Sequence, residues 1–158
     1  MKKYQTGSSL IEGLIAILIF SFGVLGTMSF QANMLAQSTQ TSYRLRASMY
    51  INSLVGAAQA DSVNFPCYTY PATPTSITTP SGITTNCAAA ITYMSTWSTN
   101  AVAMPGSSTT PPTSIYDNTP TDLLYGTLTV TVYWKLPQEK STDPVHSVSS
   151  TIQPTSGS

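Results

Sequence analysis

Charge is scarce in this 158-residue chain, since only 8% of its residues are Asp, Glu, Lys or Arg. Six basic and six acidic side chains give a net charge of zero. A protein that binds nucleic acid or an anionic membrane surface electrostatically carries a visible excess of Lys and Arg. The composition shows no such footprint, so we expect no nucleic-acid partner.

Histidine and cysteine are also scarce, with one His and two Cys in the chain. Closed structural metal sites use about four ligands, so we expect neither a metal nor a cofactor. His146, Asp143 and a serine are the residue types of a catalytic triad, but a lone histidine beside a loop is more often a surface residue. Glu139 and Asp143 have a plain explanation as solvated loop charges. No glycine-rich phosphate loop follows a strand, and we therefore predict that the chain is not an enzyme.

Proline is absent before Pro66, which permits one long helix at the start of the chain. Residues 10–30 form a mainly apolar run in which Glu12 is the only charged residue. About 20 such residues can cross a bilayer, whereas the apolar part of a removable secretory signal has about 7–15. We therefore predict an anchor that is retained. Lys2 and Lys3 precede it, so we expect the leader to stay cytoplasmic and the rest to be exported.

Glu12 is the candidate functional residue of this apolar segment. An ionised carboxylate in a membrane costs about 3 kcal/mol or more and is by default a functional-site candidate that needs a partner. Gly7 lies about a turn and a half before it. A cut after Gly7 would create an amino group at Ser8, one helical turn from the carboxylate, and this positive charge would be a suitable partner.

The leader and the start of the helix form one motif, made of Lys2, Lys3, Gly7 and the run SSLIEGLIAILIFSFGVLG from Ser8. This motif resembles the class III signal of type IV pilins and pseudopilins. The resemblance implies that a prepilin peptidase cuts after Gly7 and methylates the new N-terminus at Ser8. It further implies that Glu12 pairs with the N-terminus of a neighbouring subunit. Ser8 departs from the phenylalanine that pilins usually carry there.

The resemblance extends past the signal itself. Residues 20–26, FSFGVLG, followed by Gln31, are similar to the minor pilin family called type IV pilus modification protein PilV. That family implies an α+β type IV pilin fold, a long N-terminal helix packed on a small antiparallel sheet. It also implies a minor pilin that helps to prime pilus assembly or forms part of the tip complex.

The partners and location implied by the resemblance are those of a pilus subunit. We expect prepilin peptidase, other minor pilins, a tip adhesin and, before assembly, lipid of the bacterial inner membrane, with the C-terminal domain in the periplasm. The assembled protein would then lie in the pilus at the cell surface. The alternatives are a minor pseudopilin of a type II secretion system and a membrane-anchored binding module or adhesin. Asp117, Asn118 and Asp122 are too few for the calcium site of some pseudopilins.

Four segments follow from these patterns. We expect a leader at 1–7, a transmembrane and assembly helix at 8–30, an amphipathic helical half at 31–60 and an exported globular domain at 61–158. The helical half carries an apolar stripe at helical spacing, formed by Leu35, Tyr43, Ala47, Tyr50, Leu54 and Ala58.

Cys67 and Cys87 are expected to form a disulfide. An even number of cysteines in an exported domain favours a bridge, and closing a loop of about 20 residues contributes roughly 3 kcal/mol in the chain-entropy model. Two free thiols or a metal site are the alternatives. The loop between the cysteines is rich in Pro, Ser and Thr, and we expect it to lack a core of its own.

The rest of the exported domain shows one helical pattern, one clear strand pattern and two weaker ones. A helix is predicted at about 88–102, ending before Pro105 and Gly106, which stop helices. Residues 127–134 alternate between threonine or tyrosine and larger apolar residues, a pattern typical of a half-buried strand. A weaker partner strand is predicted at 147–152, across a polar loop at 137–144, and a short strand near 114–116.

Overall fold

The computed structural model describes residues 8–72, 76–78, 84–117, 119 and 126–154. The chain divides into an N-terminal unit, Met1–Gln40, and a globular unit, Thr41–Ser158, and helix α1 (Ser8–Ala60) contributes to both. The leader predicted at 1–7 lies outside the described residues, and the predicted segment boundaries at 30 and 60 stay predictions. The later elements are η1 (Ser62–Cys67), β1 (Ser76–Thr78), β2 (Thr84–Asn86), α2 (Ala88–Val102), β3 (Thr113–Asp117), β4 (Thr127–Trp134) and β5 (His146–Ile152).

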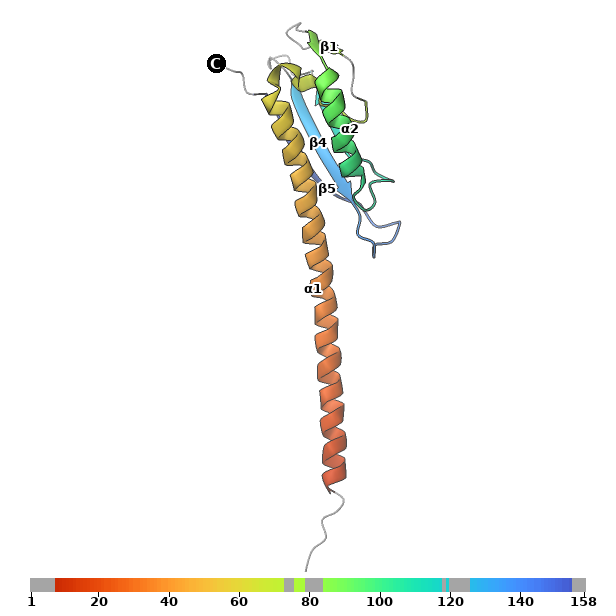
Figure 1. Cartoon of the computed structure of the whole chain (residues 1–158). Helices are drawn as coiled ribbons and strands as arrows, with labels where there is room; N and C mark the ends of the chain where they lie inside the picture. The colour runs from red at the N-terminus through yellow and green to blue at the C-terminus, as the bar shows by residue number, and fades with distance from the viewer. Residues whose placement is uncertain (1–7, 73–75, 79–83, 118, 120–125, 155–158) are drawn as a thin grey trace, which may run out of the picture. The chain divides into compact units, whose positions relative to one another are not determined.

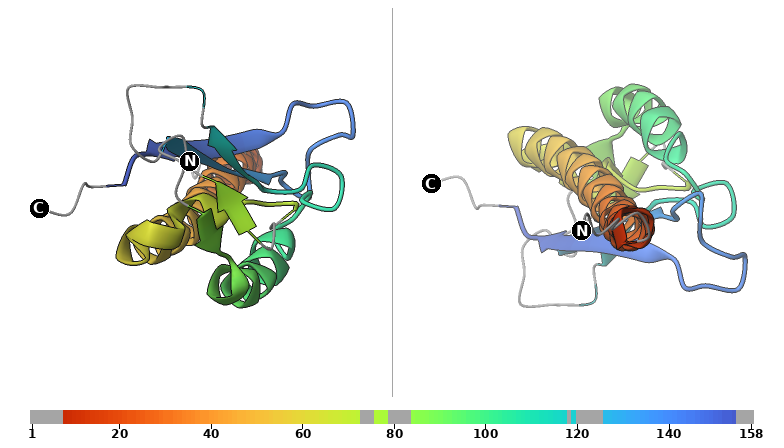
Figure 2. Two further views of the ribbon diagram at one scale, coloured as in Figure 1. Left: turned by 90° about the horizontal axis from the view of Figure 1, so that it is seen from above. Right: turned by 90° about the horizontal axis from the view of Figure 1, so that it is seen from below.

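The fold is α+β, as predicted, with a small antiparallel sheet in the order β3-β4-β5. In the globular unit, α2 and the last part of α1 cover one face of this sheet (Figures 1 and 2). Strands β1 and β2 form a separate antiparallel pair. The core lies between the two helices and the covered face of the sheet.

The long helix α1 begins and ends where the sequence predicts. Within the globular unit it buries Ala47, Ile51, Leu54 and Ala58, each at most 2% exposed. Their spacings of four, three and four residues place them on one helical face. Leu35 was predicted to join this stripe, but it lies in the N-terminal unit and is 71% exposed. That part of the prediction is wrong.

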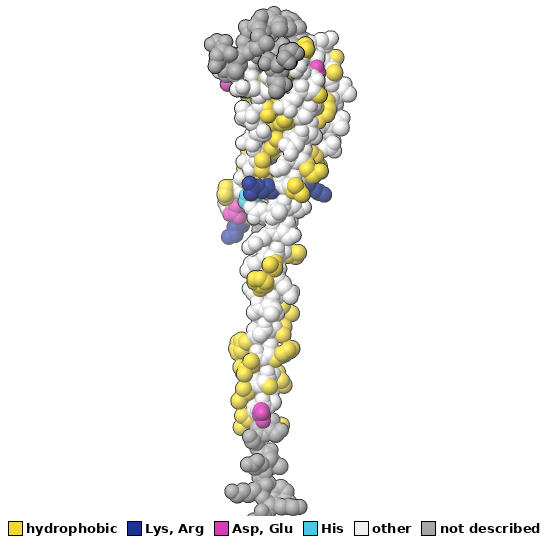
Figure 3. All heavy atoms as spheres, turned by 90° about the vertical axis from the view of Figure 1, so that its left-hand side faces the viewer, with side chains coloured by type: hydrophobic (Ala, Val, Ile, Leu, Met, Phe, Trp, Pro, Cys, Tyr) yellow, Lys and Arg dark blue, Asp and Glu magenta, His cyan; other side chains and the backbone are white. Residues whose placement is uncertain are grey.

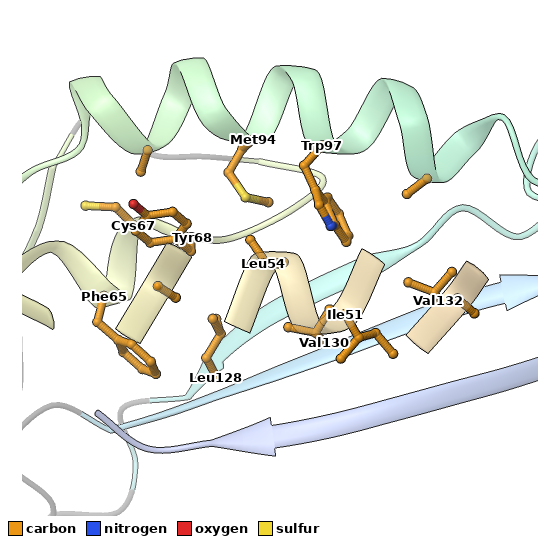
Figure 4. Close-up of a cluster of buried hydrophobic side chains, with 14 of the residues drawn as sticks. Ile51, Leu54, Phe65, Cys67, Tyr68, Met94, Trp97, Leu128, Val130 and Val132 are labelled. Carbon is orange, nitrogen blue, oxygen red and sulfur yellow. The ribbon is translucent and has the colours of Figure 1, made fainter. Parts of the chain in front are cut away.

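Strand β4 is the centre of the sheet and supplies its buried side chains. Leu128, Val130, Val132 and Trp134 are buried, while the residues between them are half-buried. Successive side chains of a strand point to opposite faces, so one face of β4 packs under the helices. Figure 4 shows side chains of β4 together with those of α1 and α2 in this core.

Helix α2 has the bounds that the sequence predicts, and it buries Ala90, Met94, Trp97 and Ala101. Two of its aromatic residues also hydrogen-bond to α1. The indole Nε1 of Trp97 donates to the carbonyl of Tyr50 at 2.9 Å, and the hydroxyl of Tyr93 donates to the carbonyl of Ser53 at 2.8 Å. These bonds show that α2 runs antiparallel to α1, because a later residue of α2 meets an earlier residue of α1.

The segment between the cysteines is more ordered than we expected. It contains the paired strands β1 and β2, in the register Ser76↔Asn86 to Thr78↔Thr84. Strand β3 is also longer than predicted. Ser114 exchanges two backbone hydrogen bonds with Tyr70, at 2.8 and 3.1 Å, so the chain after η1 is tied to the outer edge of β3.

Candidate functional site in the N-terminal helix

The N-terminal unit presents an apolar helical surface that the described residues leave exposed. The Leu, Ile, Met and Phe side chains of residues 10–30 are between 52% and 75% exposed, and Figure 3 shows apolar side chains along this part of α1. Soluble monomers rarely expose an apolar patch of more than a few hundred Å². Among the described residues one helix, α1, is long and apolar enough to cross a membrane. This surface therefore needs lipid or other helices around it.

Glu12 is the only charged side chain within this apolar surface. Its side chain is exposed, and no hydrogen bond or ion pair joins it to any residue that the structure describes. Ser8, the first residue of α1, lies four residues before it, which is the spacing of neighbours on a helix. The side chain of Ser8 and all of Gly7 lie outside the described residues. Cleavage after Gly7, methylation of Ser8 and pairing of Glu12 therefore stay predictions.

Two glycines of the membrane-length segment have space for a side chain among the described residues. A Cβ built on Gly23 or Gly26 would meet nothing within 4 Å. A glycine inside a helix costs roughly 1 kcal/mol relative to alanine, so its presence calls for another reason. Small residues let neighbouring helices approach closely in a membrane or a bundle. The glycines are consistent with helix packing against another chain.

Cys67 and Cys87 form a disulfide, as predicted, with a Cα–Cα distance of 5.2 Å. Both residues are fully buried. The bridge joins the end of η1 to the start of α2, so it fixes the two ends of the segment that holds β1 and β2. It belongs to the globular unit, whereas Glu12 belongs to the N-terminal unit, and its role is structural.

His146 has a carboxylate partner, but a different one from the triad that its neighbours suggest. Its Nε2 lies 2.7 Å from Oε1 of Glu139, and its ring stacks on Trp134 with centroids 5.6 Å apart. The carboxylate of Asp143 instead accepts the backbone N–H of Lys140. The hydrogen bond between Glu139 and His146 is the main reason why the pKa of Glu139 is lowered. Glu139 and Asp143 were predicted to be solvated loop charges, but each organises the loop between β4 and β5.

A second group of polar side chains closes the other end of the globular unit. Asp61 accepts hydrogen bonds from the Asn64 amide at 2.9 Å and the Tyr68 hydroxyl at 3.3 Å. Burial, followed by the nearby Asp61 charge, raises the pKa of Tyr68 to about 12. Within the described ranges no three His, Cys, Asp or Glu side chains gather as a metal site would require. We assign this group a structural role.

A groove between α1 and α2 has no signature in the sequence. Its volume is about 530 Å³, and its lining includes Tyr50, Tyr93 and Trp97 but no charged residue. The side chains of Tyr93 and Trp97 also hydrogen-bond across the two helices, to the backbone carbonyls of Ser53 and Tyr50. Periodicity places residues on a helical face, but it does not show where two such faces leave a gap.

No family model, curated protein or solved structure matches this chain significantly. The architecture itself defines the class. A long N-terminal helix has an apolar, exposed first part, and in the globular unit its last part packs on a three-stranded antiparallel sheet. This arrangement is pilin-like.

Proposed function

We propose that this protein is a minor type IV pilin of the PilV type, a structural subunit that helps to prime pilus assembly or forms part of the tip complex. The exposed apolar surface of residues 10–30, with Glu12 as its only charge, is the observation that carries the proposal. The pilin-like architecture and the similarity of residues 1–31 to the class III signal support it further. Catalysis has no part in this proposal.

The proposed mechanism begins with a membrane-held precursor. Residues 10–30 hold the chain in the bacterial inner membrane, with the globular unit in the periplasm. Prepilin peptidase then cuts after Gly7 and leaves an ammonium group at Ser8. Glu12 of one subunit pairs with that group of a neighbour, so both charges are neutralised within an apolar bundle. An unpaired buried charge would cost several kcal/mol, and the pairing therefore sets the register of the helices.

Cohesion in the assembled state comes mainly from apolar helix packing. The side chains that lipid surrounds in the precursor are covered by other helices in the bundle, and Gly23 and Gly26 permit close approach. Other minor pilins, pilus subunits and a tip adhesin are the proposed partners. A minor pseudopilin of a type II secretion system would use the same helix and glutamate. The partner subunits therefore distinguish a type IV pilus from a type II secretion system.

The mass of the intact protein tests the proposal. The chain is extracted from membranes of cells with and without prepilin peptidase, as the wild type and as Gly7→Ala. We expect a loss of residues 1–7 that requires both the peptidase and Gly7, with or without a methyl group on Ser8. An uncut chain in every sample would refute the pilin proposal and leave an anchored exported domain. Crosslinking of the processed chain to co-expressed minor pilins, compared with Glu12→Ala, then tests assembly.

A further inference from the structure

The sheet of the globular unit has two edges that differ in what lies beside them. Strand β3 forms one edge, where Ser114 exchanges two backbone hydrogen bonds with Tyr70 and its hydroxyl donates to the carbonyl of Tyr68. Strand β5 forms the other edge. Among the residues that the structure describes, no strand or bridge pairs with the outer side of β5. The chain after η1 therefore closes the β3 edge, and the described residues leave the β5 edge open.

The sequence of β5 does nothing to block pairing at this edge. An edge strand presents a row of unpaired N–H and C=O groups, and proteins usually protect such a row with a Lys, a Pro, a bulge or a very short strand. Strand β5 has seven residues and contains no Pro, Gly, Asp, Glu, Lys or Arg. Its register with β4 is continuous from His146 to Ile152, so no bulge interrupts it. Pro144 and Pro154 lie outside the strand, one before it and one after it.

Two apolar side chains of β5 are left incompletely covered at this edge. Val148 lies opposite Val132 of β4, on the face that packs under the helices. Ile152 lies opposite Leu128 on the same face. The two β4 residues are fully buried, whereas Val148 and Ile152 pack against the core but stay half-buried. Figure 4 shows β5 beside β4 at this border of the core. A further strand would cover the remaining apolar surface, because cross-strand neighbours lie in contact.

The pairing of β5 with β4 indicates which kind of strand fits the outer edge. Side chains of a strand point to its two faces, so a neighbour on either edge meets the same side chains. In β4, apolar residues lie opposite Val148 and Ile152, and threonines lie opposite Ser149 and Thr151. The hydroxyls of Thr129 and Thr151 also hydrogen-bond at 2.9 Å. A matching segment is therefore extended and uncharged, with apolar residues alternating with Ser or Thr.

A second copy of β5 matches this edge less well. Antiparallel pairing of two β5 strands brings Val148 opposite Ile152 only in the register centred on Ser150. That register pairs residues 148–152, which is five positions, whereas β4 pairs with β5 at seven. In the register that pairs all seven positions, Val148 lies opposite Ser150 and Ile152 lies opposite His146. A strand with the alternation of β4 is therefore the better match.

We propose that the outer edge of β5 binds an extended, uncharged segment of another protein as a fourth strand of the sheet. The segment hydrogen-bonds to the backbone of residues 146–152, and its apolar side chains cover Val148 and Ile152. In this mode of recognition the main chain supplies affinity and alternate side chains supply specificity. The pairing involves the globular unit alone, so it is independent of the processing at Gly7.

Hydrogen exchange measured at single residues tests the proposal on the full chain in a nonionic detergent. The amides of β5 are followed with and without a peptide probe. The probe is a dansyl-labelled copy of residues 127–134, TLTVTVYW, with an uncharged polyethylene glycol tail for solubility. We expect about every second amide of β5 to exchange fast in the chain alone, because residues of an edge strand bond alternately inward and outward. The probe should slow these amides and bind saturably, as fluorescence anisotropy measures.

Variants of β5 separate backbone pairing from binding elsewhere. Of Ser149→Pro and Ser150→Pro, one removes an outward N–H and keeps the bonds to β4, and its unfolding midpoint stays closer to that of the wild type. This variant should bind the probe at least about five-fold more weakly, because it loses a backbone hydrogen bond. Ser147→Lys with Ser149→Lys charges the edge at two exposed positions and should also weaken binding. Thr99→Lys, at an exposed position of α2, is the matched control and should bind like the wild type.

Four results would overturn the proposal. Slow exchange of every β5 amide in the chain alone would show that the edge is already covered. A probe that does not bind saturably would show that the edge does not accept a fourth strand. Binding that is unchanged in the proline and lysine variants would place the probe elsewhere on the chain. Protection that rises with protein concentration without the probe would assign the edge to a second copy. An uncut Gly7 would refute the pilin proposal and leave each of these results unaffected.

Discussion

Gly106, in the turn after α2, should be one of the least replaceable residues of the globular unit. Its φ is +81°, in the left-handed region that costs an L-residue with a side chain about 1–2 kcal/mol. A Cβ built there would lie 2.6 Å from Cβ of Lys135 and 3.0 Å from its backbone nitrogen. Side-chain rotation cannot relieve either contact, because neither of these atoms moves when the Lys135 side chain rotates.

Relief of the contact must instead move the backbone at the end of β4. That nitrogen donates to the carbonyl of Pro105 at 2.7 Å, a hydrogen bond that contributes about 1 kcal/mol. Adding the backbone cost to the weakened bond, we expect Gly106→Ala to lower the free energy of unfolding by about 2–3 kcal/mol. The rigid turn thus holds the end of α2 against the end of β4.

The same substitution at Gly56 provides a control of opposite sign. Gly56 is an exposed position of α1, and a Cβ built on it meets nothing within 4 Å. Alanine is favoured over glycine inside a helix by roughly 1 kcal/mol. Gly56→Ala should therefore raise the free energy of unfolding by about that amount.

Denaturant unfolding of the full chain in a nonionic detergent measures both changes. Trp97 and Trp134 are each 3% exposed in the core of the globular unit, so their fluorescence reports its unfolding. We expect the midpoint to fall for Gly106→Ala and to rise for Gly56→Ala, with the denaturant slope unchanged. A Gly106→Ala midpoint equal to that of the wild type would refute the argument about the turn, and shifts of the same sign would refute the contrast.

Three further predictions concern other parts of the globular unit. Replacing Cys67 and Cys87 together by alanine should lower the free energy of unfolding by about 3 kcal/mol, because their sequence separation is 20; equal midpoints in non-reducing denaturation would contradict this. The lowered pKa of Glu139 stabilises the fold above the unfolded pKa of about 4.3, and this stability is lost as the pH falls through the folded pKa. Glu139→Gln should flatten the acid limb of stability against pH, whereas a curve parallel to that of the wild type would count against the contact with His146. Trp97→Phe removes a donor to α1 and should cost about 1–3 kcal/mol in the same unfolding assay; no loss would show that the bond contributes nothing net.

Elements with a strong repeating pattern were predictable from the sequence. Helix α2 has a regular apolar face and a Pro-Gly stop at Pro105, and its bounds match the prediction. Strand β4 alternates over eight residues, and every second side chain is buried. In both cases local periodicity and burial favour the same structure, so no tertiary contact overrides the pattern.

Features made by contacts between distant residues were not predictable in the same way. Strands β1 and β2 are three residues each and consist mostly of Ser, Thr and Asn, so they carry no alternation to read. The pairing of Glu139 with His146 depends on how the loop folds back on β5. The number of residues between the two side chains does not determine that conformation. The antiparallel packing of α2 on α1 likewise depends on contacts between residues far apart in the sequence, since 40 positions separate Tyr93 from Ser53 and 47 separate Trp97 from Tyr50. For the candidate site, the sequence predicted a long helix with Glu12 inside its apolar part, but the chemistry of Gly7 and Ser8 stays a prediction.

The two parts of α1 differ in how their apolar residues are distributed, and this difference bears on assembly. In the globular unit the buried stripe lies on one face, whereas the Leu, Ile, Met and Phe side chains of residues 10–30 are all exposed. A helix that is apolar all round needs apolar surroundings on every side, and lipid and a bundle of helices satisfy this need about equally. Glu12 distinguishes them, because a membrane-embedded carboxylate costs about 3 kcal/mol or more and a bundle that supplies an ammonium group removes that cost. Under the proposed function, one acidic residue therefore favours transfer from lipid to the assembled bundle.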